Sequence, residues 1–270
     1  MGIRAALRGK VMRAVDEVVA RYHVEHLAEL REELAQVRSG IDDRVRREVD
    51  RAVAEAREIE VRARRDLFAA AEREAVASSA RFVQREMADA ASRPDPHATL
   101  DYALSLAPTG GMALEFGVYT GSTLKLIAAA RDGGGVYGFD SFDGLPETWR
   151  AGFRAGAFGV EGQPPEVPGA ELVVGLFDET LPGFLAEHPG PVDLLHIDAD
   201  LYSSAATVLE LVGPRLRRGS VIVFDEFFNY PGWEDHEARA WWEYVAAHPG
   251  LGFRYAAYTH DNEQVVVRLG

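Results

Sequence analysis

The sequence has 270 residues, with 29 basic and 43 acidic side chains and a formal net charge of −14 at pH 7. It contains no cysteine, which excludes disulfides, thiolate metal sites and cysteine nucleophiles. The acidic balance argues against a general nucleic-acid binder, and because the sequence has neither an apolar run of membrane-spanning length nor a signal-peptide pattern, we expect a cytoplasmic protein.

Charge and helix-breaking residues are unevenly distributed along the chain. Residues 1–90 carry 18 basic and 18 acidic side chains, so the whole net charge falls in residues 91–270. All 13 prolines lie from Pro94 onwards, and only three of the 26 glycines precede it. We therefore predict a helical oligomerisation region at 1–93 and a second domain at 94–270.

The first region has one apolar stripe. Apolar or near-apolar residues recur from Val15 to Ala70 about every 3.67 residues, which is typical of an amphipathic helix or an eleven-residue repeat. The stripe keeps its phase across Ser39-Gly40, which favours one long coiled-coil-like helix; a hairpin with Asp42 as the new N-cap is the alternative. We expect homo-oligomerisation through this stripe, ahead of packing on the second domain or binding another protein.

In the second region, short apolar runs alternate with helical segments. Strands are predicted at 112–117, 136–140, 172–175, 192–198 and 220–224, helices at 122–131, 203–216 and 234–247, and a closing β-hairpin at 253–258 and 264–269. Near-continuous apolar strands separated by helices indicate a parallel sheet covered on both faces. The predicted fold is a doubly wound, Rossmann-like α/β domain that binds ligands at the carboxyl ends of its strands.

The first of these strands leads into a glycine loop, Glu115–Ser122. Gly117 and Gly121 permit a tight turn and close backbone approach, and the following helix offers free amide groups. Asp140 ends the second strand 23 residues after Gly117, where an acidic residue in such folds binds ribose hydroxyls. The spacing E-x-G-x-x-x-G departs from that of dinucleotide sites and disfavours a nucleotide-dependent dehydrogenase. A glycine turn without a ligand is the alternative.

Four carboxylates follow the fourth and fifth of these strands. They are Asp198 and Asp200 after the former, and Asp225 and Glu226 after the latter. Adjacent parallel strands would bring them to one edge, where like charges raise one another's pKa or attract a cation. Oxygen ligands suit Mg²⁺, or less selectively Ca²⁺ or Mn²⁺. The alternative for such a residue is a helix N-cap, which fits Asp200 better than Asp198.

Five motifs follow one another in this part of the chain. They are E-F-G-V-Y at 115–119, G-F-D-S-F-D-G-L-P at 138–146, G-L-F at 175–177 with T-L-P at 180–182, H-I-D-A-D-L-Y-S at 196–203 and V-F-D-E at 223–226. In this order they resemble the macrocin O-methyltransferase family, class I S-adenosylmethionine-dependent enzymes that methylate sugar hydroxyls of natural products. The resemblance covers roughly residues 98–270.

The resemblance implies where S-adenosylmethionine binds. It places loop residues at the methionine part, Asp140 at the ribose, the two residues after Asp140 beside the adenosine, and Gly175 and Phe177 near the adenine. The implied cofactor residues are Glu115, Gly117, Tyr119, Gly121, Ser122, Asp140, Ser141, Phe142, Gly175, Phe177 and Asp198.

The resemblance also implies a Mg²⁺ site formed by Asp198, Asp225 and Glu226, the last standing where many members have Asp. A divalent cation lowers the pKa of a sugar hydroxyl, a neighbouring base takes its proton, and alignment with the sulfonium methyl supplies much of the acceleration. Asp198 is the first candidate for the base and His236 the second. His196, inside an apolar strand, is interpreted as a hydrogen-bonded core residue.

Two aromatic segments are expected to bound the acceptor. Residues 145–168 form a long excursion rich in glycine and proline, the length of a lid, and residues 227–233 follow the proposed metal ligands. The predicted function is Mg²⁺-dependent O-methylation of a sugar, glycosylated natural product or polysaccharide. The alternatives are a catechol-like or other small hydroxylated acceptor, and a non-catalytic S-adenosylmethionine-binding oligomer.

Overall fold

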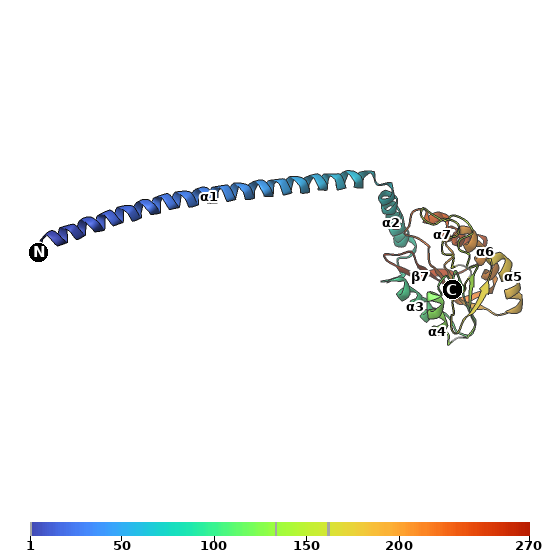
Figure 1. Cartoon of the computed structure of the whole chain (residues 1–270). Helices are drawn as coiled ribbons and strands as arrows, with labels where there is room; N and C mark the ends of the chain where they lie inside the picture. Colours follow the sequence, from blue (N-terminus) through green and yellow to red (C-terminus); the bar gives the residue numbers. More distant parts are fainter. Residues whose placement is uncertain (1, 133, 161–162) are drawn as a thin grey trace. The chain divides into compact units, whose positions relative to one another are not determined.

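A computed structural model describes residues 2–132, 134–160 and 163–270 (Figure 1). The chain divides into two compact units, the first ending at Leu67 and the second spanning Phe68–Gly270. Among the described residues, no helix combines the length and hydropathy that a membrane span requires.

The first unit is a single helix, α1 (Gly2–Arg65). It runs without interruption through Ser39-Gly40, which confirms the long helix and excludes the hairpin. Ion pairs four residues apart, such as Arg51–Glu55 at 3.0 Å, support it. Its large apolar side chains between Val11 and Val61 are all 41–68% exposed.

The second unit begins with α2 (Leu67–Glu86). Phe82 of α2 is buried among aromatic rings, including that of Trp233 at a centroid distance of 5.6 Å. Ser78 accepts a hydrogen bond from the indole of Trp233, and Ser79 accepts one from the amide of Asn229. These contacts attach α2 to the α/β domain, and the second compact unit starts at Phe68.

Eight strands of the described chain form one sheet in the order β1-β7-β8-β6-β5-β2-β3-β4. The strands are β1 (Ala91–Arg93), β2 (Met112–Phe116), β3 (Val136–Asp140), β4 (Glu171–Val174), β5 (Val192–Ile197), β6 (Leu216–Phe224), β7 (Phe253–Thr259) and β8 (Val265–Leu269). Only β8 runs antiparallel to its neighbours. The doubly wound sheet and the closing hairpin are therefore confirmed; β1, which pairs with β7, was not predicted.

Helices cover both faces of this sheet (Figure 1). They are α3 (Pro96–Leu106), α4 (Ser122–Ala130), α5 (Phe177–Glu187), α6 (Tyr202–Val212) and α7 (Glu237–Ala247), with short 3₁₀ turns at Gly213–Arg215 and Trp233–Asp235. Side chains of α3 and α4 pack into the core on one face, and those of α2, α5, α6 and α7 into the core on the other. Neither α3 nor α5 was predicted from the sequence.

Candidate active site

A cavity of about 590 Å³ opens at the carboxyl ends of the central strands, a size typical of small-molecule sites. Nine of the predicted site residues line it: Gly117, Tyr119, Asp140, Ser141, Gly175, Phe177, Asp198, Asp225 and Glu226. The expected lid segment also contributes, through Leu145, Trp149, Arg150, Phe153 and Phe158. The loops that follow the strands and the segment 145–158 thus line the same cavity.

Gly117 brings the glycine loop against the end of β5. Its φ is +94°, and a Cβ at this position would lie 1.8 Å from the carbonyl oxygen of Asp198. Any other residue would push the two segments apart. The glycine is therefore required by this close approach as well as by the turn.

Asp140 holds the same loop from the end of β3. Its Oδ2 accepts hydrogen bonds from the amides of Val118 at 2.9 Å and Tyr119 at 2.8 Å. Its Oδ1 accepts one from the amide of Phe142 at 2.7 Å. Since a carboxylate has about four acceptor positions, one remains for a ligand hydroxyl in the cavity.

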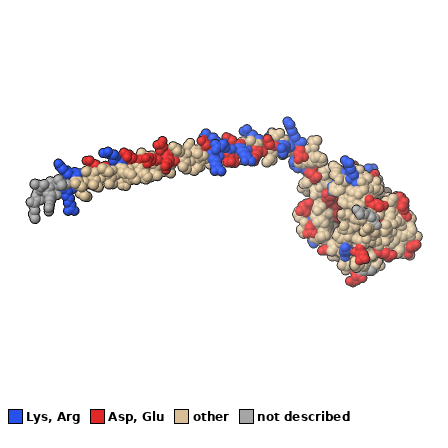
Figure 2. Space-filling model, viewed as in Figure 1, with Lys and Arg blue, Asp and Glu red and all other residues tan. Residues whose placement is uncertain are grey.

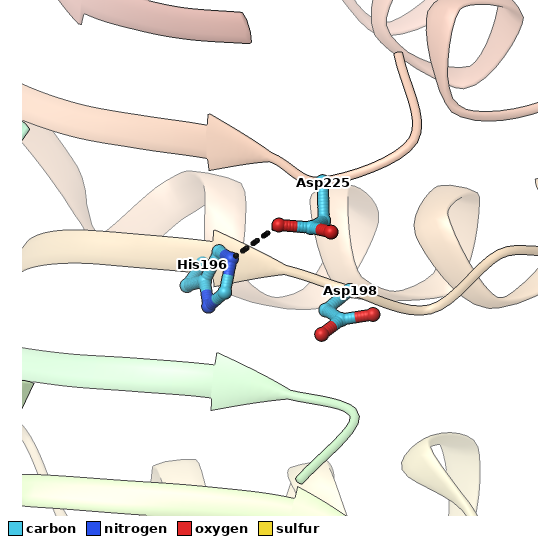
Figure 3. Close-up of side chains that lie close together, drawn as sticks. All are labelled: His196, Asp198 and Asp225. Atoms are coloured by element: carbon cyan, nitrogen blue, oxygen red, sulfur yellow. Dashed lines mark hydrogen bonds and ion pairs between the residues drawn. The ribbon is translucent and has the colours of Figure 1, made fainter. Parts of the chain in front are cut away.

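The metal-site candidates follow β5 and β6. These strands pair in parallel with Ile197 opposite Phe224, so Asp198 and Asp225 leave the sheet side by side (Figure 3). Burial raises the pKa of Asp198 well above its usual range, and the charge of Asp225 adds to this. Burial also raises the pKa of Glu226, with a further contribution from Asp198.

His196 lies behind these carboxylates and is 1% exposed. Its Nδ1 lies 3.0 Å from Oε2 of Glu115, and its Nε2 lies 3.4 Å from Oδ1 of Asp225. Burial alone would lower the pKa of His196, but the hydrogen bonds with Asp225 and Glu115 raise it well above its usual value. His196 is thus a buried, hydrogen-bonded residue as predicted, although its partners connect it directly to the carboxylate cluster.

The donor set at this edge fits a hard divalent cation. One ligand atom each from His196, Asp198 and Asp225 lies within 4.8 Å of the others, but both ring nitrogens of His196 already have partners. Glu226 is not part of that group, but it offers a third carboxylate at the same cavity, whose buried Oε2 has no hydrogen-bond partner in the described part of the chain. Such an oxygen is costly unless a cation or water satisfies it. Three carboxylates suit Mg²⁺.

Five predicted site residues do not line the cavity. They are Glu115, Gly121, Ser122, Phe142 and His236. Glu115 is completely buried and bonded to His196 and Thr123, and Phe142 lies in the core. Gly121 and Ser122 begin α4, where Gly121 adopts a left-handed conformation.

His236 lies beside the aromatic rings of Trp149 and Tyr230. Its ring centroid is 6.4 Å from that of Trp149 and 6.2 Å from that of Tyr230. Burial lowers the pKa of His236. The second candidate base, His236, therefore does not line the cavity.

Asp200 lines the cavity and does not cap α6. The N-cap of α6 is Leu201, which makes no side-chain capping bond. Asp200 adopts a positive φ of 59°, and burial raises its pKa to about 7. The N-cap interpretation of this residue was therefore wrong.

Glu237, the first residue of α7, was missed by the sequence analysis. It is fully buried and accepts hydrogen bonds from the amides of Ala199 at 3.3 Å and Glu226 at 3.2 Å. Glu237 thereby ties together the two loops that carry the carboxylates. The sequence signal that could have indicated Glu237 is its position directly after His236 in the motif W-E-D-H-E at 233–237.

Arg150 was missed as well. It forms two hydrogen bonds with Glu263, at 3.2 and 3.3 Å. Its guanidinium lies 3.9 Å from the centroid of the Trp149 ring. Because 113 residues separate Arg150 from Glu263, no local pattern indicates this pair.

Comparison with known families decides the enzyme class. Residues 114–227 match the model of a family described as a methyltransferase domain. This confirms the predicted class I methyltransferase fold and the predicted S-adenosylmethionine-dependent methyltransferase. No curated protein matches the chain significantly.

Solved structures of methyltransferases resemble the chain. CalS11, described as calicheamicin methyltransferase, is 27% identical, with 63% of this chain and 77% of that chain covered and a TM-score of 0.52. The apo structure of CalS11, described as a TDP-rhamnose 3'-O-methyltransferase, gives 26% identity, coverage of 63% and 76%, and a TM-score of 0.44. The O-methyltransferase NovP gives 21% identity, coverage of 63% and 78%, and a TM-score of 0.47.

Proposed function

We propose that this chain is a Mg²⁺-dependent O-methyltransferase that transfers the methyl group of S-adenosylmethionine to a hydroxyl of a sugar in a glycosylated natural product or polysaccharide. The observation that carries the proposal is one cavity that joins the glycine loop after β2 to the carboxylates after β5 and β6. The likeness to CalS11, described as a calicheamicin methyltransferase, supports a natural-product acceptor. Membership of the macrocin O-methyltransferase family is part of the same proposal.

The cofactor would lie over the ends of β2, β3 and β4. Gly117 allows its methionine part to approach the backbone, and Asp140 offers its remaining acceptor position to a ribose hydroxyl. Gly175 and Phe177 line the cavity at the end of β4, where an adenine would stack. These residues bind and orient the methyl donor.

Asp198, Asp225 and Glu226 would hold the cation. A bound Mg²⁺ lowers the pKa of an acceptor hydroxyl. Asp198 has two carboxylate oxygens, so one can ligate the metal while the other accepts the hydroxyl proton. We therefore assign the role of base to Asp198, which lines the cavity. His196 and Glu237 orient the neighbouring ligands through the hydrogen bonds described above.

We further propose that α1 makes the protein a homo-oligomer in the cytoplasm. Figure 2 shows charged side chains gathered on one side of the first half of α1, with an uncharged side beside them. The exposed apolar side chains of α1 would be removed from water by a second α1. An eleven-residue spacing is typical of a right-handed supercoil.

Two measurements test this function. Isothermal titration calorimetry with S-adenosylhomocysteine should detect binding, and its absence would contradict every methyltransferase proposal. Transfer of a radiolabelled methyl group to a panel of glycosides should then depend on MgCl₂ and stop in EDTA. Unchanged transfer in EDTA would exclude the metal role, and transfer to catechols alone would exclude the sugar acceptor. Cofactor binding without transfer to any acceptor would favour the non-catalytic alternative.

A further inference from the structure

Gln264 lies directly opposite the proposed metal ligand Asp225. The strands β6 and β8 pair antiparallel, with Phe224 opposite Val265. The next residues beyond this pair, Asp225 and Gln264, therefore also come opposite each other. Nε2 of Gln264 donates a hydrogen bond to Oδ2 of Asp225 at 3.1 Å. Because Gln264 is only 5% exposed, this hydrogen bond is shielded from bulk water.

The carboxylate of Asp225 fixes which way the amide of Gln264 points. An ionised carboxylate only accepts hydrogen bonds, so the NH₂ group of Gln264 points to Asp225; the reverse orientation would bring two acceptor oxygens together. The buried Oε1 of Gln264 is left without a hydrogen-bond partner among the described residues. Such an acceptor costs free energy, and an apolar side chain would avoid that cost. The amide is therefore explained by its donor contact with Asp225.

A second cavity, of about 290 Å³, lies on the other side of Asp225. Asp225 lines both this cavity and that of the candidate active site. His196 and Gln264 line the second cavity, and neither is among the described residues that line the first. The two partners of Asp225 therefore hold it from the side away from the proposed cofactor, and its other side is free for a cation.

Asp225 is held at both of its carboxylate oxygens. Its Oδ1 lies 3.4 Å from Nε2 of His196, and its Oδ2 accepts the hydrogen bond from Gln264. The terminal torsion of an aspartate has a broad intrinsic preference, so it is these two partners that fix the plane of the carboxylate. A ligand whose orientation is fixed in advance binds a cation with a smaller loss of conformational freedom.

The turn before Gln264 is itself attached to the loop after β6. The backbone amide of Phe227 donates to the carbonyl oxygen of Glu263 at 3.0 Å. The side-chain amide of Asn229 donates to the carbonyl oxygen of Asn262 at 3.3 Å. Gln264 therefore stands on a supported turn, as a residue that positions a ligand requires.

We propose that Gln264 is a positioning residue of the Mg²⁺ site: it sets the orientation of Asp225 and does not itself bind the cation. This inference rests on the proposed function, which assigns Asp225 to the cation. It gives the hairpin of β7 and β8 a role in metal binding as well as in the sheet. Loss of a partner that orients a metal ligand lowers metal affinity about 10- to 100-fold.

Gln264→Met tests the proposal, because methionine keeps the length of the side chain and removes the donor. The Kd for Mn²⁺, measured on the full-length protein from the EPR signal of free Mn²⁺, should rise about 10- to 100-fold. The Kd for S-adenosylhomocysteine and the melting temperature in EDTA should stay close to those of the unsubstituted protein. Gln84→Met, the same exchange at an exposed residue of α2, should change none of these values. A lower melting temperature with an unchanged Kd for Mn²⁺ would mean a purely structural role and overturns the proposal.

Gln264→Asn is the second variant, in case methionine disrupts the fold. It keeps an amide but is one methylene shorter, so it loses the contact with Asp225 and should also raise the Kd for Mn²⁺ at least about tenfold. If neither variant folds, Gln264 is required for folding and the positioning role is overturned. Equal Mn²⁺ affinity in all variants contradicts this inference alone. Absence of Mn²⁺ binding by the unsubstituted protein contradicts the proposed metal site itself and this inference with it.

Discussion

Asp140 accepts a hydrogen bond from the amide of Tyr119 at 2.8 Å. The residue proposed to bind the ribose therefore also shapes the loop that is proposed to bind the methionine part of the cofactor. Tyr119 adopts a positive φ of 49°, which costs energy for a residue other than glycine. The hydrogen bond that Asp140 accepts from the Tyr119 amide offsets part of this cost and keeps the loop ready for a ligand.

Asp140→Asn should weaken cofactor binding. The amide offers one acceptor oxygen in place of two, and its NH₂ group would face a backbone donor. Hydrogen bonds to a charged group contribute about 1.5–3 kcal/mol, so Kd for S-adenosylhomocysteine should rise about 10- to 100-fold in calorimetry. Asp143→Asn, an exposed neighbour, is the control and should bind normally. An unchanged Kd in Asp140→Asn would show that the loop forms without this carboxylate.

The sheet could be predicted because its central strands are short apolar runs between breakers. The predicted strand at 136–140 agrees with β3. α5 contains Pro182, which is typical of a helix break, and α3 begins at Pro96, shortly after the predicted boundary at 93/94. The three residues of β1 are too few to show a pattern. The attachment of α2 was not predictable because it depends on partners such as Trp233, far along the chain.

The site was predictable where a residue ends a strand. Asp140, Asp198 and Asp225 all line the cavity, because parallel strands end at one edge of the sheet. Glu115 does not line the cavity. Neighbouring strand residues point to opposite faces, and a loop motif does not show which of them faces a ligand. The Arg150–Glu263 pair depends on a contact that only the folded chain reveals.

Asp198→Asn should remove most of the methyl transfer. Asparagine cannot accept the hydroxyl proton, and general-base catalysis contributes about 10²- to 10⁴-fold, so kcat should fall by at least about 10²-fold. His236→Gln should keep kcat within about tenfold, because His236 does not line the cavity. Both variants are assayed with saturating glycoside and MgCl₂, after S-adenosylhomocysteine binding confirms the fold. The reverse order of effects would make His236 the base.

His196→Gln should destabilise the protein in a pH-dependent manner. The carboxylates of Glu115 and Asp225 raise the pKa of His196 above its usual value of about 6.5. A raised pKa in the folded state stabilises the fold fully below pH 6.5, and this contribution is lost as the pH rises through the raised pKa. Breaking a buried ion pair costs about 3–5 kcal/mol.

Urea unfolding in EDTA at pH 6 and pH 9 measures this effect. The loss of unfolding free energy in His196→Gln, relative to the unsubstituted protein, should be larger at pH 6 than at pH 9. His26→Gln, on the exposed surface of α1, should change neither value. An equal loss at both pH values would mean that His196 acts through packing and not through its charge.

Truncation before α2 and truncation after it should have different consequences. Removing residues 1–67 leaves the whole second unit, so cofactor affinity and thermal stability should be retained while the molar mass measured by light scattering falls to that of a monomer. Removing residues 1–93 also deletes Phe82 and the hydrogen bonds of Ser78 and Ser79. Since Phe→Ala alone in a core costs about 3–5 kcal/mol, this shorter chain should melt at a much lower temperature.

Phe82→Ala in the full chain is the matched test, and equal stability of both truncations would show that α2 does not belong to the domain.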